Sequence, residues 1–141
     1  MEKEKTIKQI VAEIEERKLS KMKEILMLQG ICRVSIAHIL ASNSVETGWT
    51  TEDKEILMLQ NNAGASVAHN LAQDSDKTGW STDDKEILLL QDKAGVSVAF
   101  ILAYYHPTWT TSDPELLSLT NKWGNTVKDA LIAKESKRRK N

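Results

Sequence analysis

The chain of 141 residues contains one cysteine, two prolines and one phenylalanine. A single cysteine, Cys32, excludes an internal disulfide and a four-thiolate metal site, and is typical of a reducing compartment. No apolar run approaches the roughly 20 residues that a membrane-spanning helix needs. The charged start, "MEKEKTIKQI", lacks the apolar core of a secretory signal. We therefore expect one cytoplasmic domain.

The net charge of −1 hides an uneven distribution. Residues 41–115 hold twelve acids against four lysines, whereas residues 134–140, "KESKRRK", hold five basic residues and one acid. A basic tail can contact nucleic acid, but such an end is more often solvated, so residues 136–141 are predicted to be disordered. The acidic middle argues against binding to a duplex, because phosphate neutralisation requires clustered Lys and Arg.

The sequence contains an internal repeat with a period of 31 residues. Glu24, Glu55 and Glu86 open "EILMLQ", "EILMLQ" and "EILLLQ", and Glu115 opens "ELLSLT" after a shorter step of 29 residues. The segments "SIAHILA" (35–41), "SVAHNLA" (66–72) and "SVAFILA" (97–103) keep the same spacing, and "TVKDALI" (126–132) is a diverged last copy. The units are predicted at about 20–46, 47–77, 78–106 and 107–135.

Each unit predicts a short helix followed by a longer one. The longer helix is expected to begin after a serine N-cap, and a preceding glycine permits the turn that enters it. These positions are Ser35, Ser66 and Ser97, with Gly64, Gly95 and Gly124. Pro114 suits the first position of a helix, so the aligned residues Asp53, Asp84 and Asp113 are predicted to be the N-caps of the short helices.

Neither helix can bury its apolar side alone, so the copies are expected to stack side by side. The predicted fold is all-α, an α-solenoid of about four short-helix/long-helix repeats. Residues 1–19 carry Ile7, Ile10, Val11 and Ile14 at helical spacing, which predicts an amphipathic helix that caps the open end of the stack. The polar last copy would close the other end.

The segments "NNAGASVAHNLA" and "DKAGVSVAFILA" resemble the D-x-x-G-x-T-P-L-H-x-A-A stretch of ankyrin repeats. In the first of them, Ser66, Ala68, His69, Leu71 and Ala72 stand in the Thr, Leu, His, Ala and Ala positions. The segment "DPELLSLTNKWGNTVKDALIAKE" also resembles a leucine-rich-repeat-variant unit. The resemblances cover about residues 20–135, depart from both families in period, and imply a helical stack that binds rather than catalyses.

Two groups of residues are candidates for chemistry. His38 and His69 recur at one repeat position, with Cys32 in the same sequence, but Phe100 replaces them in the third copy, so a structural role is favoured over a metal. The carboxylates of "TED" and "TDD" could form an acid–base pair, yet their place at helix starts favours a helix-dipole role. No nucleophile elbow, Walker loop, dinucleotide fingerprint or HExxH occurs, so we expect neither an enzyme nor a cofactor.

Aromatic side chains are the candidate partner-binding residues: Trp49, Trp80 and Trp109 at equivalent loop positions, with Tyr104 and Tyr105. Each tryptophan could cover its short helix, which is the favoured interpretation, or form an exposed stripe, since Trp and Tyr are frequent interface hot spots. The leading hypothesis is a non-enzymatic protein-interaction module. The alternative is a nucleic-acid-associated protein that uses Lys137, Arg138, Arg139 and Lys140. Weak self-association through the N-terminal helix is a third possibility.

Overall fold

The computed structural model describes residues 6–139, which form an all-α chain with isolated β-bridges and no strand in that range. The long first helix α1 spans Ile7–Met27 and is followed by a 3-10 turn at Ile31–Arg33. The other helices are α2 (Ile36–Ser42), α3 (Ser44–Thr47), α4 (Lys54–Leu57), α5 (Val67–Gln73), α6 (Ser75–Thr78), α7 (Lys85–Leu88), α8 (Val98–Tyr105), α9 (Pro114–Leu117) and α10 (Val127–Arg139).

The short helices α4, α7 and α9 begin where the sequence predicts. Asp53, Asp84 and Asp113 are their N-caps, and each carboxylate accepts from backbone N–H groups of the first turn. Pro114 occupies the first helical position of α9, where a missing N–H leaves no hydrogen bond unmade. Each helix is a single turn of four residues, and its stability depends on burial of residues such as Ile56 and Leu57.

The longer helices α2, α5 and α8 begin at Ser35, Ser66 and Ser97, whose hydroxyls accept from the backbone N–H three residues on. In the loop before each helix, a glutamine pairs with the capping serine in a single antiparallel bridge. Gly64 turns this loop at φ +77°, and an added Cβ would lie 3.0 Å from the backbone nitrogen of Lys93 in the next copy. A side chain at Gly64 would be strained, because it would combine a left-handed backbone angle with a close approach to the next copy.

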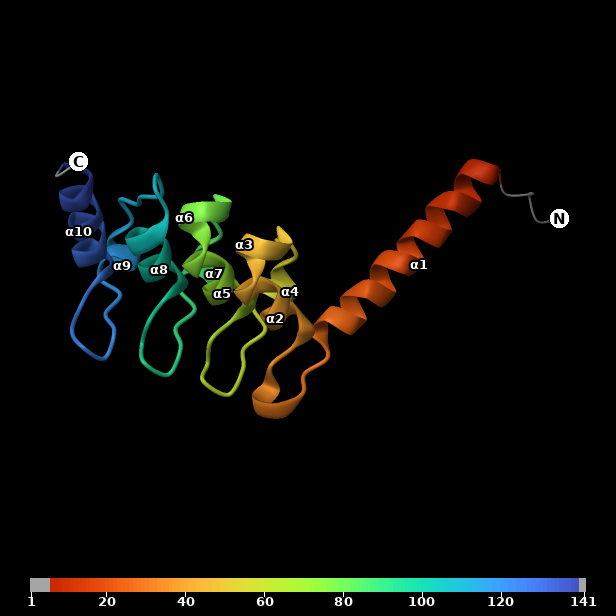
Figure 1. Ribbon diagram of the computed structural model, residues 1–141, viewed down its shortest axis with the longest axis horizontal. Helices are drawn as coiled ribbons and strands as arrows, with labels where there is room; N and C mark the ends of the chain where they lie inside the picture. Colours follow the sequence, from red (N-terminus) through yellow and green to blue (C-terminus); the bar gives the residue numbers. More distant parts are fainter. Residues whose placement is uncertain (1–5, 140–141) are drawn as a thin grey trace.

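The long helices lie side by side in chain order, with α5 packed between α2 and α8, and α10 packed on the far side of α8 (Figure 1). Small side chains allow this approach: the alanines at the helix contacts, Ala37, Ala68, Ala99, Ala41, Ala72 and Ala103, are fully buried. Leu71 and Leu102 complete the core between them. The core is therefore a continuous row along the stack, with contacts mainly between consecutive copies.

The loops between short and long helices hang from one edge of this row and are joined by backbone hydrogen bonds (Figure 1). The N–H of Asn62 donates to the carbonyl of Cys32, that of Lys93 to Ala63, and that of Lys122 to Ala94, with N···O distances of 2.8–3.0 Å. The copies are thus held by packed helices at their centre and by main-chain hydrogen bonds at the loop tips.

The predicted capping role of the N-terminal helix is wrong. Helix α1 projects away from the stack, and Ile7, Ile10, Val11 and Ile14 remain exposed, Ile7 by 82% (Figure 1). The helix also crosses the predicted boundary at residues 19 and 20 and absorbs the short helix of the first copy. The physical reason is that Met22 stands where the other copies have a capping aspartate, so no signal ends one helix and starts another.

The far end of the chain also differs from expectation. Residues 136–139, assigned to a disordered tail, continue helix α10, and residues 140–141 lie outside the described residues. Helix α10 covers α8 with Val127 and Ala130, while Lys128 and Asp129 face solvent. Polar substitutions at outward positions let this last helix end the stack without a further neighbour.

Candidate functional site

The tryptophans do not form the exposed stripe that one interpretation required. Trp80 and Trp109 are buried, and their indole N–H groups donate to the backbone carbonyls of Thr51 and Thr82 in the preceding copy, at 3.2 and 3.3 Å. Trp49 is half-buried against the same core. These side chains therefore join consecutive copies. The prediction that Trp80 and Trp109 bind a partner is wrong, because both rings are buried.

The tyrosines fare differently, since Tyr104 and Tyr105 are 39% and 44% exposed at the end of α8. Their rings meet edge to face with centroids 4.8 Å apart. They form one wall of a groove of about 310 Å³ between α5 and α8. Among the five aromatic residues predicted to bind a partner, the two tyrosines are exposed and line this groove.

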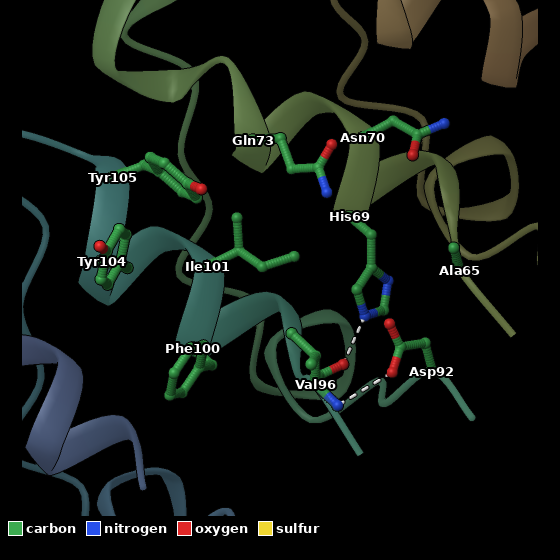
Figure 2. Close-up of a pocket in the computed structure, with 10 residues that line it drawn as sticks. All are labelled: Ala65, His69, Asn70, Gln73, Asp92, Val96, Phe100, Ile101, Tyr104 and Tyr105. Atoms are coloured by element: carbon green, nitrogen blue, oxygen red, sulfur yellow. Dashed lines mark hydrogen bonds between the residues drawn. The ribbon is translucent and has the colours of Figure 1, made fainter. Parts of the chain in front are cut away.

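The groove has an aromatic wall and a polar wall (Figure 2). Helix α8 supplies Phe100, Ile101 and the two tyrosines, while α5 supplies His69, Asn70 and Gln73. The floor is completed by loop residues Ala65, Asp92 and Val96. The groove therefore combines apolar and polar side chains, and ligand sites use both kinds.

His38 and His69 each link their own copy to the next one. In each, Nδ1 lies 2.7 Å from the hydroxyl of its capping serine and accepts from that serine's backbone N–H. Nε2 donates to a carbonyl of the following copy, Ala65 for His38 and Val96 for His69. Burial lowers the pKa of both imidazoles, which keeps them neutral. The neutral Nε2–H tautomer is the one that satisfies all these partners.

The carboxylates at the short helices belong to a ladder of ion pairs. Lys23 contacts Asp53 and Glu55, Lys54 contacts Asp84 and Glu86, and Lys85 contacts Asp113 and Glu115, all at 2.7–3.2 Å. Hydrogen bonds from Lys85 lower the pKa of Asp113. Each lysine therefore joins its helix to the capping turn of the next copy, which gives Asp53 and Asp84 a structural role.

The basic C-terminal residues are partly engaged with the stack. The ammonium of Lys137 lies 3.3 Å from the hydroxyl of Tyr104 and 4.6 Å from the centre of its ring. Lys134 donates to the carbonyls of His106 and Trp109. The side chains of Arg138 and Arg139, and the whole of Lys140, lie outside the described residues. The structure thus brings one predicted nucleic-acid residue, Lys137, beside the tyrosine wall.

His106 is a structural residue that the repeat pattern does not indicate. This buried imidazole accepts from the backbone N–H of Trp109 at 2.9 Å through Nδ1, and its Nε2 lies 3.2 Å from the carbonyl of Gly79. It replaces the extra helical turn found in the first two copies as α3 and α6. The signal was present in "YYHPTW", where the two-residue shortening must be bridged by some side chain.

Within residues 6–139, no three His, Cys, Asp or Glu side chains gather in an arrangement that could hold a metal ion. None of the helices in that range combines the length and apolar character required to cross a bilayer. No family model matches the sequence, and comparison with curated proteins finds no significant match.

Proposed function

We propose that the chain is an α-solenoid of about four helical repeats, similar in design to ankyrin-like stacks, that acts as a non-enzymatic protein-interaction module. Support comes from the recurrence of the same caps, glycine turns and inter-copy hydrogen bonds at a spacing of 31 residues. Such a stack presents a preformed surface whose side chains need little ordering when a partner binds.

The groove between α5 and α8 is the proposed docking site. The observation that carries this proposal is the pairing of two half-exposed tyrosines with a wall of amide side chains on packed helices. Tyrosine buries a large area on binding at a low cost in side-chain entropy, and its hydroxyl can hydrogen-bond at the rim. Gln73 offers both a donor and an acceptor to a peptide backbone, whereas the amide nitrogen of Asn70 already donates to the carbonyl of His38 at 3.2 Å.

The preferred ligand in this proposal is a protein segment with a basic residue flanking an apolar anchor. Asp92 lies in the groove, and the segment 41–115, which supplies all the lining residues, carries a net charge of −8, while Lys137 lies beside Tyr104. Such a field attracts cations and raises the rate at which a basic segment is captured. The volume of about 310 Å³ suits one large side chain with the adjoining backbone.

A displayed random-peptide library, selected against the full chain, tests this proposal. We expect enriched peptides that pair an aromatic or aliphatic residue with Lys or Arg. Their affinities, measured by calorimetry, should fall about tenfold or more for Tyr105→Ala and for Gln73→Ala. The matched control is Trp123→Ala, because Trp123 is 65% exposed and lies outside the groove.

Peptides that bind both groove variants as tightly as the unaltered chain would contradict the proposal.

A salt titration with arbitrary single- and double-stranded nucleic acids tests the alternative function, a nucleic-acid-associated protein. Binding that weakens steeply with salt and is lost on deletion of residues 134–141 would support the nucleic-acid proposal instead.

A further inference from the structure

Helix α1 exposes an apolar stripe that nothing in the described chain covers. Ile10, Val11 and Ile14 are 44–51% exposed and Ile7 is 82% exposed, on a helix that leaves the stack (Figure 1). We propose that this stripe is an interface between two copies of the chain, in which the α1 helices pair antiparallel. This inference concerns a surface remote from the groove and does not depend on the proposed function.

The spacing of the stripe is compatible with such a pair. The four side chains occupy positions i, i+3, i+4 and i+7, and so form one face over two turns. A twofold axis between residues 10 and 11 places Ile7 of one copy opposite Ile14 of the other, and Ile10 opposite Val11. The face is therefore complementary to itself, as a symmetric dimer interface requires.

Charge selects the antiparallel arrangement. At 100° per residue, Lys8 and Glu15 lie on the same flank of the stripe, about 10 Å apart along one helix, which is too far for them to pair. When the helices run in opposite directions, Lys8 of each copy faces Glu15 of the other, which gives two ion pairs. A parallel pair would instead place the basic face of Arg17, Lys18 and Lys21 against its own copy.

The placement of α1 leaves room for this pairing. Because the helix points away from the stack, two antiparallel helices would carry their stacks at opposite ends (Figure 1). The contact involves about two turns of each helix, so it falls in the class of small interfaces below roughly 1,200 Å², which associate weakly. We therefore expect a dimer that forms at micromolar concentrations and dissociates on dilution.

Sedimentation equilibrium of the full chain tests the pairing with reciprocal charge reversals. Lys8→Glu alone and Glu15→Lys alone each turn two attractions into two repulsions, and each should weaken the dimer at least about fivefold. The double variant K8E/E15K should restore the original affinity. A mixture of the two single variants should form a heterodimer, since each flank then meets an opposite charge.

Lys77→Glu is the matched control, because Lys77 is exposed on α6 far along the chain from α1. Circular dichroism on every variant establishes that lost association is not lost helix. The proposal is overturned by a chain that stays monomeric up to about 500 µM, or by a dimer that ignores both reversals. A monomer whose α1 binds phosphatidylserine vesicles would also overturn it, since the stripe would then serve a lipid surface.

Discussion

At the scale of single residues, His38 and His69 show how one side chain can couple two copies. Each imidazole closes a capping box with its own serine and reaches a carbonyl of the next copy. Protonation would add a hydrogen to Nδ1, where the serine N–H already points, so the charged form is disfavoured. The lowered pKa values are thus a direct consequence of burial and of this geometry.

We expect the free energy of unfolding to fall as the pH drops below about 6.5, the ordinary histidine value. The unfolded imidazoles bind protons in this range and the folded ones do not, so stability is complete above 6.5 and decreases toward the lowered folded pKa. Urea unfolding between pH 5 and pH 8 measures this dependence. The double variant H38F/H69F should flatten the profile at a cost of about 1 kcal/mol per site; an unchanged profile would refute the role assigned to the histidines.

The tryptophans lead to a second prediction at this scale. Trp80→Ala should lower the free energy of unfolding by about 3–5 kcal/mol, because it removes a buried ring and its hydrogen bond to Thr51. Trp123→Ala should change it by less than about 0.5 kcal/mol, since that ring is largely exposed. Equal effects of the two substitutions in urea titrations would show that Trp80 is not a core residue. Trp80→Phe serves as the milder variant if Trp80→Ala does not fold.

At the scale of elements, the helix starts could be predicted because capping is local chemistry. Aligning Pro114 with the other copies identified the capping aspartates, and the serines were recognisable from the residues that follow them. The direction of α1 could not be predicted in this way. Its stripe has the spacing of a buried face, but what covers such a face depends on packing between distant parts of the chain.

The groove shows the same division. Tyr104 and Tyr105 are among the predicted partner-binding residues, and they line the groove. Asn70 and Gln73 also line the groove but are not among the predicted residues, because amide side chains in a helix carry no pattern of their own. The burial of Trp80 and Trp109 depends on a neighbouring copy, so their sequence position allowed both outcomes.

The capping aspartates of the short helices have two roles that substitutions can separate. Asp113→Asn keeps a hydrogen-bond acceptor at the cap of α9 and removes the charge that faces Lys85, whereas Asp113→Ala removes both. We expect the midpoint of thermal unfolding to fall in the order wild type, Asn variant, Ala variant. Added salt should lower the midpoint of the wild type more than that of either variant. A lower midpoint for the Asn variant than for the Ala variant would contradict the capping role.

Acid should reveal the same carboxylate. Since the contact with Lys85 lowers the folded pKa of Asp113 below its ordinary value of 3.8, its stabilising effect is present above that pH. The effect is lost as the pH falls toward the folded pKa. The effect of Asp113 sets in below about 3.8, whereas that of the histidines sets in below about 6.5, so the two contributions differ in the pH at which they begin.

At the scale of the whole molecule, the main helix contacts run between consecutive copies, from α2 to α5, α8 and α10. For the proposed solenoid, we expect stability to be close to a sum of its units and their interfaces, with one neighbour fewer at each end. We expect amide hydrogen exchange to be slowest in α5 and α8, which are covered on both sides. It should be fastest in the first turns of α1, which are exposed all round. Mass spectrometry measures this exchange. Equal protection of the amides along residues 6–139 would indicate that the chain unfolds as a single cooperative block instead.

The main-chain hydrogen bonds at the loop tips have a bearing on how such a chain can change in length. Each loop offers a carbonyl to its successor and an N–H to its predecessor, as Ala63 and Asn62 do in the second copy. The lysine ladder runs in the same direction, because each copy contributes a lysine to the next copy and a carboxylate to the previous one. A duplicated segment of 31 residues, inserted between the second and third copies, could form the same hydrogen bonds and ion pairs with the copies on either side of it. Gene duplication could thus lengthen the molecule in whole steps without inventing a single new contact.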